Sequence, residues 1–272
     1  MNRARADRRP CVARRAATGA APPARWTREP PLRCGFQKTG VDPVPTSETV
    51  AGRVGCQQTE FAMHVILVNG SPHPHGCTYT ALEAVSSTLR EAGIETGFFQ
   101  VGTKPLAGCI ACRTCAKTGR CVFDDKVNEF VELAAQADGF VFGSPVHYAA
   151  ASGAMTSFMD RAFFSSMLSG RSVFRLKPGA AVASARRSGT TAALDQLNKY
   201  MTWGEMPVVS SRYWNMVHGN TPDEVLQDLE GMQVMRILGR NMAWLLKCKE
   251  AGLRAGIALP EAEQRVSTNF IR

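Results

Sequence analysis

Residues 65–78 have the sequence VILVNGSPHPHGCT, an apolar run that stops at a glycine and is followed by a short polar loop. The β-branched run predicts a strand over 63–69, and apolar residues at helical spacing predict a helix over 78–92. A helix that begins directly after such a loop offers backbone N–H groups and the positive end of its dipole to an anion. We expect either an anion site or a plain strand-to-helix turn at this point.

The composition of this loop limits which anion it could bind. A triphosphate-binding loop has the pattern G-x-x-x-x-G-K-[ST]. Here five residues separate Gly70 from Gly76, and Cys77 stands where the lysine would be. Ser71 and Thr78 still supply hydroxyl groups, and Gly76 allows the backbone to approach a ligand closely. The loop therefore favours a single phosphate over ATP or GTP.

The rest of the chain alternates between strand and helix patterns. Further strands are expected at 96–101, 139–144, 179–185 and 206–211. Further helices are expected at 125–137, 190–202 and 223–250, and a loop followed by a helix is expected from Pro145 to about Phe164. Strands this apolar are buried on both faces, as in a parallel sheet covered by helices. The alternation predicts one doubly wound α/β domain over residues 63–255.

The two ends of the chain differ from this domain in composition. Residues 1–62 contain 11 Lys or Arg and 5 Asp or Glu, so +6 of the net charge of +9 lies there. We interpret them as a disordered, solvated extension, with the working protein starting near Met63, and expect neither a nucleic-acid nor a membrane partner. Arg8 and Arg9 precede no apolar export segment, and no membrane span is present, so we expect a cytoplasmic protein with a C-terminal tail over 256–272.

A second informative loop follows the expected third strand and has the sequence GSPVHYAAASGAMTSFMDR (143–161). Ligands of open α/β sheets bind beyond the carboxyl ends of the strands, where the strand order reverses. Pro145, Val146, His147 and Tyr148 place a kinked backbone and two flat rings at that edge, which suits a planar ligand. A planar ring joined to one phosphate is the combination found in FMN.

Four of the nine cysteines form a compact motif, C-x2-C-x2-C-x5-C, at Cys109, Cys112, Cys115 and Cys121. Three interpretations stay open. Zinc usually takes two separated pairs, a cubane iron-sulfur cluster takes four closely spaced thiolates, and an empty loop would hold reduced or redox-active thiols. Disulfides are disfavoured in a chain that lacks an export signal.

These three segments together resemble the NADPH-dependent FMN reductase superfamily, and more narrowly its iron-sulfur flavoprotein branch. The motifs are VNGSPHPHGCT, CIACRTCAKTGRCVFDD and ADGFVFGSPVHYAAASGAMTSFMDR, and the likeness covers about residues 63–250. The resemblance implies a flavodoxin-like fold, in which a five-stranded parallel sheet of order 2-1-3-4-5 has helices on both faces. It also implies a homo-oligomer, either a dimer or a tetramer.

The resemblance also implies roles for individual residues. The FMN phosphate would be bound by Ser71, His73, Gly76, Cys77 and Thr78. The isoalloxazine would lie near Pro145, Val146, His147 and Tyr148, and the loop SARRSGT, with Ser184 and Arg187, would approach the flavin from the other side. Cys109, Cys112, Cys115 and Cys121 would hold one [4Fe-4S] cluster beside the flavin. The family usually has asparagine at the position of Cys77, which puts one phosphate contact in doubt.

The function expected from these observations is an FMN-dependent oxidoreductase. It would pass electrons from NAD(P)H, docked transiently, through the flavin to a small-molecule or protein acceptor, because no G-x-G-x-x-G fingerprint is present. His147 is a candidate proton donor, Arg186 and Arg187 are candidates for the extra phosphate of NADPH, and Asp160-Arg161 suggests a structural ion pair. The alternatives are an electron carrier that uses FMN and a [4Fe-4S] cluster, and a thiol-based redox sensor.

Overall fold

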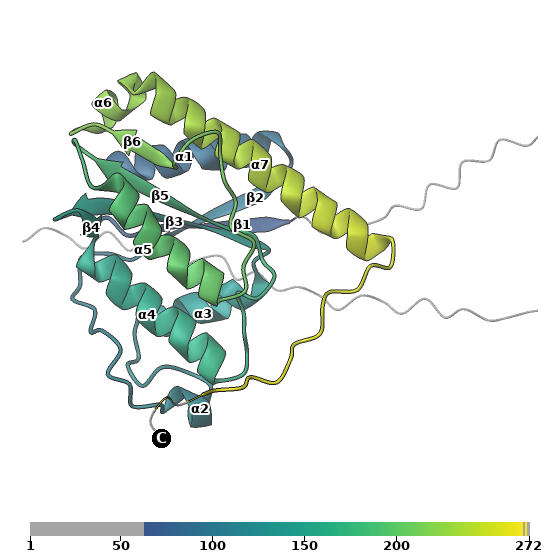
Figure 1. Cartoon of the computed structure of the whole chain (residues 1–272). Coiled ribbons are helices and arrows are strands. Elements are labelled where there is room, and N and C mark those ends of the chain that lie inside the picture. The colour runs from purple at the N-terminus through teal and green to yellow at the C-terminus, as the bar shows by residue number, and fades with distance from the viewer. Residues whose placement is uncertain (1–62, 269, 271–272) are drawn as a thin grey trace, which may run out of the picture. The chain divides into compact units, whose positions relative to one another are not determined.

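The computed structural model describes residues 63–268 and 270, all of which belong to one unit of the chain. The predicted extension over 1–62, including Arg8 and Arg9, lies outside the described residues. A sheet runs through the centre of the described part, with helices on both of its faces (Figure 1). No helix among residues 63–268 combines the length and the apolar character needed to cross a membrane.

The sheet contains five parallel strands and one short antiparallel strand. The strands are β1 His64–Asn69, β2 Glu95–Gln100, β3 Gly139–His147, β4 Ala150–Ala151, β5 Gly179–Ala185 and β6 Met216–His218. The parallel strands follow the order β2-β1-β3-β5-β6, and β4 pairs antiparallel with the end of β3. Because β5 and β6 are the fourth and fifth parallel strands, the predicted flavodoxin-like order 2-1-3-4-5 is confirmed.

The position predicted for the fifth strand, 206–211, is wrong by several residues. That segment makes only one isolated bridge, between Val208 and Gly179. Beyond the bridge, the carbonyl oxygen of Ser210 accepts a hydrogen bond from Asn241, which draws the chain away from the sheet. The chain returns further along β5, where Met216–His218 pair with Ala183–Ala185.

The helices cover the sheet as two layers. They are α1 Cys77–Glu91, α2 Cys115–Thr118, α3 Lys126–Gln136, α4 Gly153–Leu168, α5 Thr190–Trp203, α6 Pro222–Gln227 and α7 Leu229–Arg254. Helices α1, α6 and α7 lie on one side of the sheet and α3, α4 and α5 on the other, as Figure 1 shows. Alternate residues of β1 enter different cores: Ile66 packs with the second layer and Leu67 with the first. This two-residue period explains why the strand is apolar at every position from Val65 to Val68.

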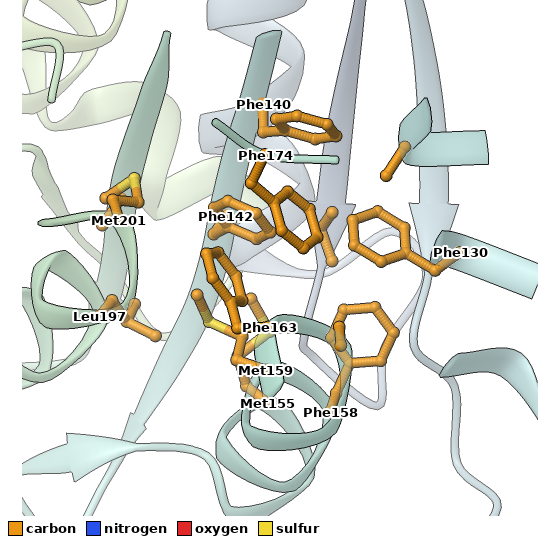
Figure 2. Close-up of a cluster of buried hydrophobic side chains, with 14 of the residues drawn as sticks. Phe130, Phe140, Phe142, Met155, Phe158, Met159, Phe163, Phe174, Leu197 and Met201 are labelled. Atoms are coloured by element: carbon orange, nitrogen blue, oxygen red, sulfur yellow. The ribbon is translucent and has the colours of Figure 1, made fainter. Parts of the chain in front are cut away.

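The core beneath α3 and α4 is rich in phenylalanine (Figure 2). Phe130 of α3 lies at the centre of this group, 4.9 Å from the ring of Phe158 and 6.0 Å from that of Phe174. Phe163 stacks on Phe174 at 4.2 Å. Each fully buried ring of this size contributes about 1.5–3 kcal/mol through burial alone. The group therefore fixes α4, which leads from the sheet edge to the cysteine loop.

The structure refines two helix boundaries. In the loop-and-helix segment expected from Pro145, β3 continues to His147 and turns into β4, and helix α4 begins at Gly153. The long helix expected over 223–250 is divided at Asp228, whose carboxylate caps α7 by accepting from Gly231 N. The same carboxylate accepts a hydrogen bond from His218 N at the end of β6, so the break ties α7 to the sheet.

The chain beyond α7 contains no helix or strand among its described residues. This part corresponds to the tail expected from the sequence. Arg175 donates hydrogen bonds to the carbonyl oxygens of Pro260 and Glu261, and Arg265 lies over the ring of Trp203 at 5.6 Å. These contacts hold the tail along the ends of α4 and α5.

Candidate functional site

The loop between β1 and α1 lies at the carboxyl edge of the sheet. Gly76 is the N-cap residue of α1, and no side chain caps the helix there. A Cβ atom added at Gly76 would lie 3.0 Å from the Cβ of His73, so the loop is folded tightly on itself. An uncapped helix terminus behind a tight loop is the arrangement that binds a phosphate.

Two amides at the ends of neighbouring strands hold this loop from inside. The buried Asn69 accepts from Ser71 N at 3.0 Å, and its Nδ2 donates to the carbonyl oxygen of His73 at 3.3 Å. Asn69 Nδ2 also donates to Gln100 Oε1 at 2.8 Å, and Gln100 Nε2 donates to Ser71 O at 2.6 Å. The Oγ atom of Ser71 accepts from His73 N. The loop is therefore preorganised by its own strand ends.

The helical side of the loop contains three of the expected phosphate ligands. Thr78 is buried, and its hydroxyl group lies 2.8 Å from that of Ser184 at the end of β5. This bond joins two residues that were both expected to contact the cofactor. Cys77 lies beside Gly219, whose carbonyl oxygen is 3.6 Å from Sγ, and burial raises the pKa of the Cys77 thiol. Cys77 is therefore a neutral thiol near neutral pH and adds no negative charge at the loop.

The segment after β3 forms a tight hairpin with β4. Tyr148 and Ala149 both have positive φ, at 49° and 58°, as a two-residue turn between antiparallel strands requires. Pro145 and Val146 are partly buried at the base of the turn, whereas His147 is exposed and Tyr148 is fully exposed. The hairpin thus presents both rings to solvent at the same sheet edge as the phosphate loop.

The loop after β5 packs directly against this hairpin. Gly189 has φ of 92°, and a Cβ atom there would lie 2.6 Å from Ala149 Cα and 2.9 Å from Val146 Cγ1. Arg186 and Arg187 are exposed just before this contact, and Gly189 is the N-cap of α5 without a side-chain cap. Three loops expected to contact the cofactor, after β1, β3 and β5, therefore lie at one edge of the sheet.

The four cysteines of the compact motif line one small hollow against α4. The hollow also contains Arg161 and Phe164, while Ile110 and Val122 form its apolar rim. Cys109 and Cys112 are exposed, Cys121 is partly buried and Cys115 is buried, and all are free thiols. Within residues 63–268 no group of three or more His, Cys, Asp or Glu is placed to hold a single metal ion.

The environments of these thiols differ. Hydrogen bonds from the side chain and backbone of Thr114 lower the pKa of the Cys112 thiol, whereas burial raises the pKa of Cys115. Asn128 holds the backbone of Cys121 from both sides, accepting from its N–H at 2.9 Å and donating to its carbonyl oxygen at 3.0 Å. The buried half of the loop is fixed, and the exposed half, with Cys109 and Cys112, is the part free to adjust.

Asp160 and Arg161 do not pair with each other. Arg161 forms a bidentate ion pair with Asp125, with nitrogen–oxygen distances of 2.7 and 2.8 Å. Asp160 instead accepts a hydrogen bond from the Tyr200 hydroxyl, and burial together with this carboxylate raises the pKa of Tyr200 well above its usual range. Asp160 and Tyr200 line an apolar groove of about 410 Å³ between α4 and α5. Phe164 lines both this groove and the cysteine hollow.

Sequence reasoning missed several residues that organise these sites. Asn69 and Gln100 were included in strands, although the position directly after an apolar strand and before the loop is a signal for Asn69. The role of Gln100 depends on β1 and β2 being neighbours. Gly189 could have been suspected only as a turn glycine, because its contact with Ala149 comes from a hairpin 40 residues earlier.

The fold defines a class: an α/β protein with flavodoxin-like strand order, in which the loops after β1, β3 and β5 lie at one edge of the sheet. The sequence profile of the NADPH-dependent FMN reductase family matches residues 63–221. The chain belongs to this family, and it is an oxidoreductase.

Individual relatives agree with this assignment. The chain is 32% identical over 192 residues to an iron-sulfur flavoprotein of Methanocaldococcus jannaschii, covering 68% of this chain and 98% of that protein. Among solved structures, it is similar to RosB with a bound 8-demethyl-8-formylriboflavin-5'-phosphate intermediate, with a TM-score of 0.56 and 14% identity over 78% of this chain and 94% of that one. It is also similar to an NAD(P)H:quinone oxidoreductase from Methanothermobacter marburgensis, with a TM-score of 0.53 and 18% identity over 66% and 96%. At these identities the two structures show the shared fold.

Proposed function

We propose that this chain binds FMN at the carboxyl edge of its sheet and transfers electrons from NAD(P)H to a small-molecule or protein acceptor. The observation that supports this most directly is the uncapped start of α1 beside the hairpin of β3 and β4. The family to which the chain belongs favours FMN as the ligand. When bound, FMN supplies the chemistry of hydride acceptance and electron release, and the protein supplies position and electrostatics.

In this proposal the phosphate loop fixes the cofactor and the hairpin orients its ring. Backbone N–H groups at the start of α1 bind the phosphate, assisted by Ser71 and His73 from the loop and by the dipole of α1. Backbone groups of Pro145 and Val146 face the edge of the flavin ring. Tyr148, fully exposed at the turn, covers the ring from solvent, and this contact is the one most dependent on ligand binding.

His147 and Arg187 have roles that follow from their exposure. His147 is exposed beside the platform and is the proposed proton donor to the reduced ring or to the acceptor. Arg187 is exposed next to Gly189 and would bind the extra phosphate of NADPH, because a guanidinium forms paired hydrogen bonds with phosphate oxygens. We also propose a homo-oligomer in a reducing cytoplasm, where the exposed thiols Cys109 and Cys112 would stay reduced.

The experiment is anaerobic titration of the full-length protein with FMN and with riboflavin, followed by NADPH or NADH. We expect tight FMN binding, much weaker riboflavin binding, and loss of the flavin absorbance on adding NADPH. Arg187→Ala should raise the KM for NADPH and leave that for NADH unchanged. A protein that binds neither flavin would refute the proposal. Equal binding of the two flavins would refute the phosphate site.

A second candidate function is electron transfer through FMN and a [4Fe-4S] cluster. It is favoured by the four thiols that line one hollow, since four thiolates with an apolar surrounding are the donor set of such a cluster. Each thiolate of such a cluster binds its own iron, so the four sulfurs need to surround the hollow that they line and need not meet at a single metal ion. Iron and acid-labile sulfide analysis of anaerobically purified protein tests this candidate. Four of each per chain would support it, and none after reconstitution would exclude it.

A further inference from the structure

Arg161 is the largest fully buried side chain in the described part of the chain, and it lies against the cysteine hollow. Its side chain has an exposed fraction of 0%. A guanidinium keeps its charge in proteins, and that of Arg161 is held by hydrogen bonds with Asp125 and Cys121. A buried charge is costly unless its partners are well placed, so its contacts indicate why it is there.

Those contacts connect both arms of the cysteine loop. Arg161 Nη1 donates to Ala107 O at 3.3 Å, just before the first cysteine of the motif. Its Nη2 donates to Phe123 O at 3.3 Å, just after the last cysteine, and the guanidinium lies 4.8 Å from the Phe123 ring. One side chain of α4 thus holds the entry and the exit of the segment that contains all four thiols.

The fifth donor of this guanidinium is directed at a sulfur atom. Arg161 Nε lies 3.2 Å from Cys121 Sγ. The charge of Arg161 is already balanced by Asp125, which also caps α3 by accepting from Val127 N at 3.1 Å. The contact with Cys121 is therefore not needed to neutralise the arginine. It favours a sulfur that carries negative charge, as a metal-bound thiolate does.

We propose that Arg161 is a positioning residue of the cysteine site, which fixes the Cys121 sulfur and stabilises negative charge on the metal-ligating thiolates. This inference rests on the second candidate function above. Hydrogen bonds to the sulfur ligands and nearby charge are among the factors that set the reduction potential of an iron-sulfur cluster. A cation at Cys121 makes reduction, which adds negative charge, more favourable.

The test compares Arg161→Met and Arg161→Lys with the wild type and with Arg171→Met. Arg171 is a matched control, because it also forms a bidentate pair, with Glu132 of α3, but lies outside the cysteine loop. Methionine removes the charge and all five hydrogen bonds. Lysine keeps the charge but cannot bond Asp125 and Cys121 together in the same fork geometry. Each full-length protein is reconstituted anaerobically with ferrous iron and sulfide.

Two measurements follow on each variant. Potentiometric titration monitored by EPR should show a midpoint potential at least about 59 mV more negative in Arg161→Met than in the wild type. For one electron, this shift corresponds to a tenfold change in the ratio of reduced to oxidised cluster. Loss of acid-labile sulfide should be about tenfold faster than in the wild type, with Arg161→Lys intermediate. Hydrogen exchange of the apoproteins should show lost protection over residues 107–125 in both Arg161 variants and unchanged protection in Arg171→Met.

The outcomes separate this inference from the function on which it rests. A wild type that takes up no sulfide removes the cluster, and overturns the charge-stabilising role of Arg161 with it. A wild type with a cluster whose potential is the same in Arg161→Met overturns the inference and leaves the cluster standing. If Arg161→Met does not fold, Arg161→Lys decides: wild-type potential and wild-type exchange in that variant overturn the inference.

Discussion

Asn69→Ala is the sharpest test of the phosphate loop, because one buried amide organises it without being a cofactor ligand itself. Asn69 is 1% exposed. The substitution removes an acceptor for Ser71 N at 3.0 Å and a donor to Gln100 Oε1 at 2.8 Å, together with two longer bonds to the carbonyl oxygens of His73 and Pro74 at 3.3 and 3.4 Å. Alanine leaves the β1 backbone unchanged, so the effect should be confined to the loop.

The magnitude follows from the two shorter hydrogen bonds. Each contributes about 1 kcal/mol net, and leaving the buried Ser71 N–H without a partner adds about 1 kcal/mol or more. If about 2 kcal/mol of this appears as lost preorganisation of the phosphate site, the Kd for FMN rises about 30-fold. Riboflavin has no phosphate, so its affinity should change less than threefold.

The assay is quenching of flavin fluorescence on titration of the variant, with far-UV circular dichroism to confirm folding. Asn241→Ala is the control, since it removes one exposed side-chain hydrogen bond, to Ser210 O, far from the loop. Its FMN affinity should equal that of the wild type. An Asn69→Ala protein that loses FMN and riboflavin affinity in the same proportion, or loses neither, refutes the argument that Asn69 acts through the phosphate site.

Three further predictions concern single residues. Gly189→Ala should lower the Tm by several degrees and weaken flavin binding, because the added Cβ would lie 2.6 Å from Ala149 of the hairpin. Gly170→Ala is the control, because Gly170 also has a positive φ, of 74°, but no atom lies within 4 Å of the added Cβ. It should show only the smaller effect of backbone strain on the Tm, and wild-type flavin binding. Cys77→Asn should lower the Kd for FMN several-fold, because it adds an amide donor for the phosphate at the start of α1. A tenfold higher Kd would contradict a phosphate contact at this position. The hydrogen bond from Arg171 lowers the pKa of Glu132 from its usual value of 4.5. The pair therefore stabilises the fold at pH values above 4.5, and this stabilisation is lost as the pH falls through the lowered pKa. The Tm advantage of the wild type over Glu132→Gln should therefore disappear in acid, and an advantage that grows on acidification would contradict it.

The parts of the fold that follow from local pattern were predictable from the sequence. The strand over 63–69 is apolar from Val65 to Val68 because its two faces enter different cores, and this continuous run is visible in the sequence alone. The fifth strand was misplaced because MPVVSS has the composition of a strand, yet it makes only one bridge to β5, and Ser210 O accepts a hydrogen bond from Asn241 of α7. A tertiary contact of this kind leaves no mark in the local sequence.

The start of α4 shows a related limit. The segment after Ser144 was expected to be a loop that leads into a helix, and no hairpin was expected there. In the structure, two positive-φ residues, Tyr148 and Ala149, form a turn that neither residue type favours. The turn is stabilised from outside: Gly189 packs against Ala149, and the side-chain oxygen of Gln196 of α5 accepts a hydrogen bond from Ala151 N at 3.1 Å. Local propensity is overridden here by packing between β5, α5 and the hairpin.

Helix α4 connects the two chemically distinct regions of this protein. At its start, Ser152 caps the helix and donates to the carbonyl oxygen of Gly70 in the phosphate loop at 3.1 Å. Nine residues later, Arg161 contacts Cys121, which at 1.5 Å per residue is about 13 Å along the helix axis. The phenylalanine core holds α4 rigidly against the sheet between these two points (Figure 2). The separation of the cysteine hollow from the phosphate loop is therefore set by one helix and not by the cysteine loop. Substitutions in the exposed half of the loop should alter Cys109 and Cys112 without moving Cys121 relative to the sheet edge.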